Sequence, residues 1–160
     1  MLALKDIVEI QTSATQVFEW LSHFDENYRA WHPDHVVCKY LRGASLQVGS
    51  ILYCEEYLHG KLHRMKFRVA SVAAGSRVDY VMAPGMSGSF EIKPTERGAQ
   101  FIAEICMGAT VPLLGRLLDK ILDLLFSTRI EQVRRHMSEE GVNLKHLLEQ
   151  QSVGSAAPAR

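Results

Sequence analysis

The chain has 160 residues, of which 47% are hydrophobic and 22% charged, as expected for a single domain with one core. Its 18 lysine and arginine residues balance 18 aspartate and glutamate residues, so no net charge attracts nucleic acid or an anionic membrane. No signal peptide is evident, and we expect a cytoplasmic protein with one domain over residues 1–150 and a disordered tail over residues 151–160.

The first predicted elements are a short strand and two helices. Residues 6–10 alternate polar and apolar side chains, as a strand does. Ser13 and Gln16 have the spacing of a helix capping box, and apolar residues follow at helical intervals. A second helical piece over residues 26–31 stops at His32, because a residue that precedes proline disfavours the helical conformation.

Five or six strand-like runs follow, separated by turns that contain glycine or proline. A long helix from about Pro112 to Glu140 closes the domain, and Gly141 is expected just beyond its C-terminus. Asn143 is expected to cap a last short helix that ends at Glu149. The strand-like runs lie near residues 36–42, 47–58, 61–73, 76–82, 88–94 and 99–108.

The longest apolar stretch, residues 111–126, belongs to this long helix. Its four charged residues fall on one side of the helix, opposite a row of leucine and isoleucine residues, which predicts an amphipathic helix that covers the core. A membrane span would need an uninterrupted apolar stretch, and a helix lying on a membrane would carry a basic polar face. The four charged residues are Arg116, Asp119, Lys120 and Asp123.

The three cysteines are odd in number and widely spaced, and they form no Cys-x-x-Cys motif. They fit reduced, mostly buried thiols in a cytoplasm better than a disulfide framework or a zinc ribbon. These residues are Cys38, Cys54 and Cys106.

A strand, two helices, a run of antiparallel strands and one long helix predict an α+β domain. This order resembles the START-like superfamily, also called the SRPBCC or polyketide cyclase/dehydrase group, over roughly residues 3–140. The resemblance implies the helix-grip fold, in which a curved antiparallel sheet wraps around the C-terminal helix and leaves a cavity. The fold hosts ligand carriers, cyclases, hydrolases and oxygenase domains, so it does not specify a function.

The hairpin with its turn at residues 59–60 indicates which side chains face this cavity. Its register places Glu56 opposite His63 and Glu55 opposite Arg64. Alternation then puts Glu56 on an apolar, inward face and Glu55 on a charged, outward face. A buried carboxylate is costly unless it is paired, so Glu56 needs His63, a metal ion or the water of a wide pocket as its partner. The apolar residues of the inward face are Leu52, Cys54, Met65, Phe67 and Val69.

His136 and Glu140 lie one turn apart near the end of the long helix, where positions i and i+4 share a face. With His35 and Glu56 they form a set of two histidines and two carboxylates, which suits zinc or another first-row divalent ion. His32 competes with His35, which we prefer because it begins a strand. A solvated, charge-rich helix face is the alternative reading of the pair on the long helix.

These residues resemble one branch of the START-like group, the diacetylphloroglucinol and phloretin hydrolases. The resemblance rests on the segments Trp31–His35 and His136–Gly141 and on Glu56. It implies zinc held by a histidine after the early helices, a strand glutamate and a His-x-x-x-Glu pair. It also implies hydrolysis of a carbon–carbon bond beside an aryl ketone.

Further side chains receive roles within this hypothesis. His63 is the candidate general acid or base, because its unperturbed pKa lies near 6.5. Tyr28 would hold a phenolic hydroxyl of the substrate, and Met65 and Phe67 would belong to the apolar wall of the cavity. The expected partner is a small hydrophobic or aromatic molecule, and the sequence leaves room for a homodimer.

Two other functions compete with the hydrolase. A metal-free carrier or polyketide cyclase/aromatase would use the same cavity without a cation. A regulatory or assembly domain would bind another protein through the leucine-rich helix.

Overall fold

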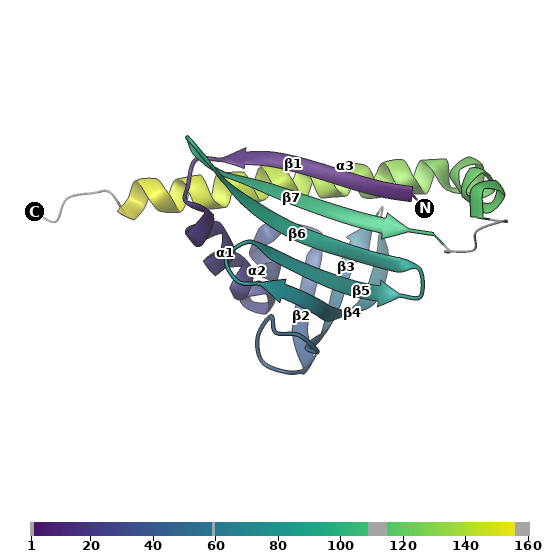
Figure 1. The fold of residues 1–160 in the computed structure, drawn as a ribbon, viewed down its shortest axis with the longest axis horizontal. Helices are drawn as coiled ribbons and strands as arrows, with labels where there is room; N and C mark the ends of the chain where they lie inside the picture. Colours follow the sequence, from purple (N-terminus) through teal and green to yellow (C-terminus); the bar gives the residue numbers. More distant parts are fainter. Residues whose placement is uncertain (1, 59, 109–114, 156–160) are drawn as a thin grey trace, which may run out of the picture.

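The computed structural model describes residues 2–58, 60–108 and 115–155, with side chains described through 108 and again over 130–151. The described part of the chain forms seven strands and three helices in the predicted order, except that one long helix stands where a long and a short one were expected (Figure 1). The elements are β1 (Leu2–Ile10), α1 (Ala14–Ser22), α2 (Phe24–Trp31), β2 (His35–Arg42), β3 (Ile51–Leu58), β4 (Lys61–Ala73), β5 (Arg77–Ala83), β6 (Met86–Thr95), β7 (Gly98–Met107) and α3 (Gly115–Ser155).

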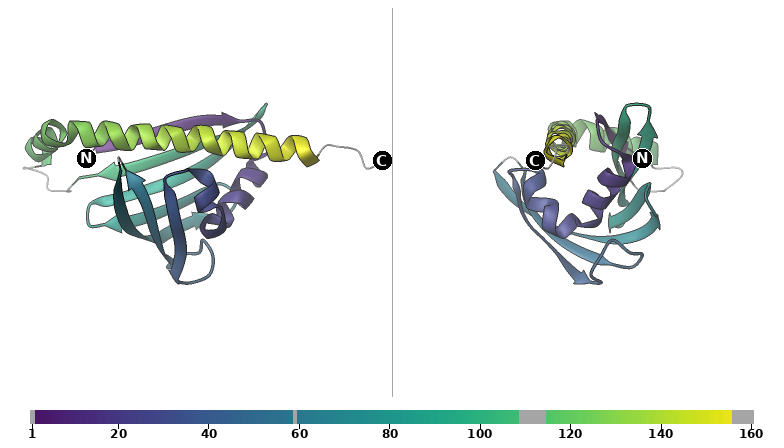
Figure 2. Two further views of the ribbon diagram at one scale, coloured as in Figure 1. Left: turned by 180° about the vertical axis from the view of Figure 1, so that it is seen from behind. Right: turned by 90° about the vertical axis from the view of Figure 1, so that its left-hand side faces the viewer.

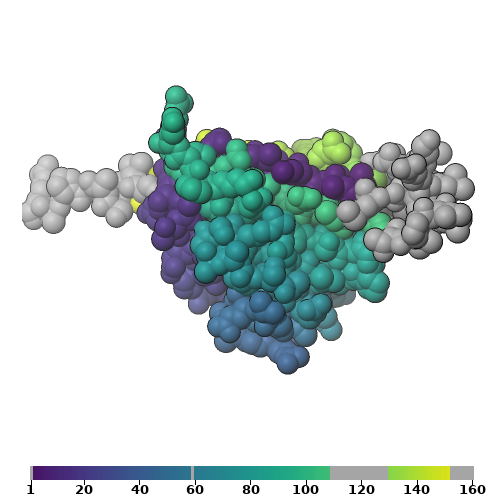
Figure 3. Space-filling view, viewed as in Figure 1, coloured from purple at the N-terminus to yellow at the C-terminus, as the bar shows by residue number. Residues whose placement is uncertain are grey.

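The strands form one antiparallel sheet in the order β1-β7-β6-β5-β4-β3-β2. The sheet curves around the interior, and the three helices lie across its open side (Figure 2). α3 packs mainly along β1 and also contacts β3, β7 and α2. In Figure 3 the opposite face is a continuous surface of strands, beyond which the β6–β7 hairpin projects at the upper left. The predicted α+β class is confirmed.

The N-terminal predictions hold with small changes. The capping box of α1 is confirmed, because Ser13 Oγ accepts the N–H of Gln16 and the Gln16 side chain accepts the N–H of Ser13. β1 begins at Leu2 and not at residue 6, since it pairs with β7 along its whole length. The predicted strand over 47–58 starts only at Ile51, because residues 47–50 form a hydrogen-bonded turn.

The end of the long helix is a correction. α3 continues through Gly141 and Asn143 to Ser155, so Gly141 does not end it and Asn143 does not cap a separate helix. A Cβ at Gly141 would overlap with the Asp6 carboxylate of β1, so this glycine lets α3 approach the sheet closely. In the sequence, a glycine that ends a helix looks the same as a glycine that allows close packing inside one. The predicted helix start at Pro112 lies outside the described residues.

α3 also enters the segment 151–160 that we expected to be a disordered tail, of which residues 156–160 lie outside the described part. Among the described helices, none combines the length and the apolar character that a membrane crossing requires.

The core lies between the concave face of the sheet and the helices. Aromatic rings of α2 fill it, with Trp31 almost fully buried and in edge-to-face contact with Phe24 and Phe90. Phe24, Tyr28 and Trp31 follow one another at helical spacing and are all buried. α2 is therefore fixed against the sheet at the point where the chain turns into β2.

Candidate metal centre and its cavity

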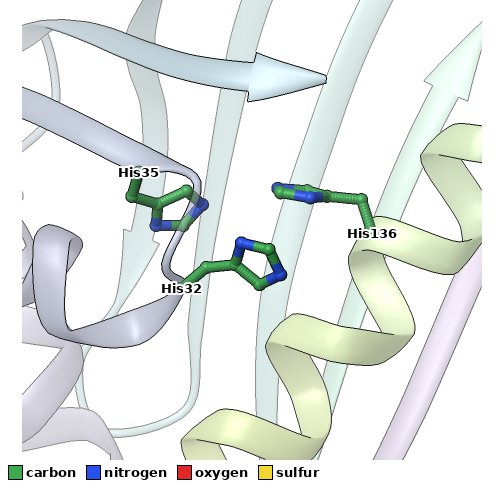
Figure 4. Close-up of side chains that lie close together, drawn as sticks. All are labelled: His32, His35 and His136. Carbon is green, nitrogen blue, oxygen red and sulfur yellow. The ribbon is translucent and has the colours of Figure 1, made fainter. Parts of the chain in front are cut away.

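The four predicted ligands come together where α2, β2, β3 and α3 meet. His35 is the first residue of β2 and pairs with Glu56 of β3. His136 and Glu140 reach the same place from α3, where the backbone carbonyl of Glu140 accepts the indole N–H of Trp31 at 2.9 Å. In Figure 4 the rings of His32, His35 and His136 point toward one another from the α2–β2 turn and from α3.

The distances between these groups are short. Nε2 of His35 lies 3.0 Å from Oε1 of Glu140 and 3.6 Å from Oε2 of Glu56. Nε2 of His136 lies 3.8 Å and 3.9 Å from the same two oxygens. His35, Glu56 and His136 are buried, so solvent screens their interactions only weakly. Two imidazoles and two carboxylates therefore surround one small volume.

The hydrogen bonds of His35 determine which nitrogen faces this volume. Nδ1 lies 2.7 Å from the carbonyl oxygen of Tyr28, which can only accept, so Nδ1 carries a proton. In the neutral ring, Nε2 then presents a lone pair to the carboxylates. The 3.0 Å contact with Glu140 lacks hydrogen-bond geometry, and Nε2 of both His35 and His136 is buried without a hydrogen-bond partner in the described part of the chain. A lone pair against carboxylate oxygens requires a cation or a proton between them.

The pKa values reflect the same crowding. Burial raises the pKa of Glu56, and the charge of Glu140 raises it further. Burial lowers the pKa of His35, but the contact with Glu140 and the bond to the Tyr28 carbonyl outweigh it, so the pKa is raised. Burial lowers the pKa of His136. His35 and Glu56 therefore bind a proton more tightly than usual, whereas His136 binds one less tightly.

His32 lies next to the cluster. One ring nitrogen from each of His32, His35 and His136 can be chosen so that all three lie within 4.8 Å of one another. Its own nitrogens are engaged differently. Nδ1 accepts the backbone N–H of Asp34 at 3.1 Å, which leaves the proton of the neutral ring on Nε2, 3.5 Å from Oε2 of Glu139. His32 would have to give up one of these contacts to bind a metal, whereas His35 would not.

The predicted hairpin register is confirmed. Glu56 pairs with His63 and is buried, while Glu55 pairs with Arg64 and forms an outward ion pair with it at 3.1 Å. His63 lies on the predicted face opposite Glu56, but it is exposed and is not among the described residues that line the cavity. Strand register decides which face of the sheet a residue lies on. The residue is buried only where another element packs over that face. The acid–base role of His63 stays a prediction.

The partner of Glu56 is Tyr28, whose hydroxyl donates to Oε2 at 2.8 Å. We had assigned Tyr28 to a substrate hydroxyl, which stays a prediction, since Tyr28 also lines the cavity. The sequence contained a signal for the burial of Tyr28, namely its helical spacing to Phe24 and Trp31. No spacing rule connects it to Glu56, which lies on another element.

A cavity opens beside the cluster, with about 650 Å³ of space, part of it open to solvent. Met65 and Phe67 line it, as predicted. Its acidic and imidazole groups gather at one end, so a ligand would meet an apolar wall and a single polar corner. The described lining consists of Phe24, Tyr28, Trp31, Glu56, Leu58, Met65, Phe67, Tyr80, Met82, Phe90, Ala103, Ile105, Val133, His136, Met137 and Glu140.

Comparison with known proteins identifies the fold. No family model matches the sequence, and no curated protein matches it either. Among solved structures, the Zhui aromatase/cyclase of Streptomyces sp. R1128 has a TM-score of 0.73 at 15% identity, over 98% of this chain and 99% of that one. A protein of Thermus thermophilus has a TM-score of 0.69 at 11% identity, over 98% and 100%. A protein of Nitrosomonas europaea has a TM-score of 0.66 at 17% identity, over 95% and 97%.

At these identities the likeness concerns the fold and not the activity. Together with the curved antiparallel sheet and the long C-terminal helix, it confirms the START-like, helix-grip α+β fold predicted from the order of elements.

Proposed function

We propose that this chain is a metal-dependent hydrolase of a small aromatic or polyketide-like ketone, with His35, Glu56, His136 and Glu140 as ligands of one divalent ion, zinc in the first place. One observation carries the proposal. Two buried imidazole nitrogens, which have no hydrogen-bond partner among the described residues, face two carboxylates at 3.0 to 3.9 Å. A cation would satisfy all four groups at once.

The donor set and its spacing both support zinc. Two ligand atoms of a tetrahedral zinc ion lie about 3.3–3.6 Å apart, as its bond lengths of about 2.0–2.2 Å require. The four measured contacts bracket this range. Two carboxylates would also neutralise the charge of a divalent ion, so the buried site would carry no net charge.

The cavity supports the substrate class. Its apolar wall would hold an aromatic ring, while the polar corner would receive the acyl oxygen. A bound zinc ion would act as a Lewis acid on that oxygen. In the overall reaction, water adds its oxygen to the acyl carbon, the bond from this carbon to the ring breaks, and the ring carbon takes a proton. The products are a carboxylic acid and an arene.

A metal-free polyketide cyclase/aromatase or ligand carrier is the second candidate. It draws on the likeness to an aromatase/cyclase and on the mostly apolar cavity. In this case the cluster would be held together by protons on His35 and Glu56, whose pKa values are both raised. Ligand binding would then be indifferent to chelators.

Metal content separates the two candidates. We expect protein purified without chelators or a histidine tag to contain about one zinc ion per chain by elemental analysis, because the four proposed ligands converge on one place. We also expect it to release acid and arene from an acylated phloroglucinol, followed by chromatography, and to lose this activity after chelation. Protein that contains no metal and takes up none from added zinc would overturn the proposal.

Binding of zinc should release protons, because the metal displaces those that the cluster otherwise holds. The raised pKa values of His35 and Glu56 mean that these groups keep their protons to a higher pH than usual, so zinc affinity should rise with pH as the protons are lost, and binding should release a measurable number of protons per ion. Calorimetric titrations in two buffers of different ionisation enthalpy measure this number. A binding enthalpy independent of the buffer would contradict the expectation.

A further inference from the structure

Tyr28 contacts two of the four ligands in three ways. Its backbone carbonyl accepts the Nδ1–H of His35 at 2.7 Å, and its ring stacks on the His35 ring with centroids 3.9 Å apart and planes 4° apart. Its hydroxyl donates to Oε2 of Glu56 at 2.8 Å. Tyr28 is 3% exposed, so water does not compete for these contacts.

The hydrogen bond from the Tyr28 hydroxyl orients the carboxylate of Glu56. Oε2 of Glu56 is also the oxygen that faces Nε2 of His35 at 3.6 Å and Nε2 of His136 at 3.9 Å. A carboxylate oxygen offers two lone-pair directions. When the Tyr28 hydroxyl occupies one of them, the other is aimed at the imidazoles. The carbonyl contact does the same for His35, because it commits Nδ1 to a proton and leaves Nε2 free.

We propose that Tyr28 is the positioning residue of the metal centre, setting its affinity by orienting His35 and Glu56 together. This inference rests on the proposed function, since it requires that the four residues bind a cation. Removal of a residue that orients a metal ligand typically lowers metal affinity roughly 10- to 100-fold. Here one side chain orients ligands from two different strands.

Tyr28→Phe tests the hydroxyl alone, because phenylalanine retains the stacked ring and the backbone carbonyl. We expect zinc affinity to fall roughly 10- to 100-fold in competition with a chromophoric chelator. The visible absorption of bound Co²⁺, which reports ligand geometry, should also change shape. A residue that only supported the fold would leave the Co²⁺ spectrum of the folded protein unaltered.

Tyr53→Phe is the matched control. Tyr53 donates its hydroxyl to Glu55, so it forms the same kind of tyrosine–glutamate contact on the outward face of β3. Its removal should leave zinc affinity within about twofold, and the Co²⁺ spectrum should superimpose on that of the wild type. Circular dichroism and melting temperature verify that both variants fold.

A double-mutant cycle provides the second measurement. In a Glu56→Gln background the residual zinc affinity should no longer respond to Tyr28→Phe, because the hydroxyl acts through the carboxylate. Equal zinc affinity and identical Co²⁺ spectra in wild type and Tyr28→Phe would overturn the inference, and so would failure of Tyr28→Phe to fold. A wild-type protein that binds neither ion would instead refute the proposed function.

Discussion

Replacement of His136 by alanine is expected to weaken zinc binding by at least about 100-fold. Sites with four protein ligands bind zinc with roughly 10–16 kcal/mol, so one ligand accounts for about 3 kcal/mol. The loss should affect metal binding more than folding, because the buried imidazole has no hydrogen-bond partner for its Nε2 among the described residues. Competition with a chelator, followed by elemental analysis, measures it.

Three further histidine variants sharpen this experiment. His35→Ala should have an effect similar to that of His136→Ala, whereas His32→Ala should cost much less, because its nitrogens are engaged by Asp34 and Glu139. His146→Ala is the control, as an exposed histidine on the same helix. A large loss in His32→Ala together with none in His35→Ala would reverse the ligand assignment.

Gly98→Ala is expected to destabilise the fold by at least about 3 kcal/mol, as strained backbone and core overpacking each cost about 1–3 kcal/mol. Gly98 begins β7 with φ of 148°, a conformation open only to glycine. An added Cβ would overlap with the carbonyl oxygen of Ile10 and lie 2.9 Å from the backbone nitrogen of Thr12. Backbone atoms cannot rotate away as a side chain would. Urea denaturation measures the change in the free energy of unfolding.

Gly75→Ala is the matched control for this substitution. Gly75 also has a positive φ, of 76°, but a Cβ there would meet no atom within 4 Å. Only the conformational strain remains, which costs about 1–2 kcal/mol outside glycine. Equal destabilisation in the two variants would show that the contact with the end of β1 is not what requires glycine at position 98.

Local patterns were sufficient for the class of fold and for two of the four residues of the candidate metal centre. The turn at residues 59–60 and strand alternation together separated Glu56 from its neighbour Glu55, and the structure has the same register. Both signals act between residues close in the chain, where geometry leaves few choices. The spacing of His136 and Glu140 was equally local, because a helix places positions i and i+4 on one face.

Gly141 and His63 mark where local patterns fail. Glycine near a predicted helix end reads as a terminus, yet Gly141 lies inside α3 because Asp6 of a distant strand occupies the space of a side chain. His63 lies on the predicted face, yet it is exposed, because burial there would require cover by an element distant in the sequence. In both cases the deciding neighbour lies far away in the sequence.

The sequence by itself determined the α+β class, the faces of the β3–β4 hairpin residues and the shared helix face of His136 and Glu140. Each of these follows from the fixed periods of strand and helix and from the chemistry of a tight turn. Only the tertiary structure decided that His35 has a free lone pair while His32 does not, and that Tyr28 orients Glu56. Both contacts depend on how α2, β3 and α3 pack against one another. The direction of side chains where three elements meet follows no periodic pattern in the sequence.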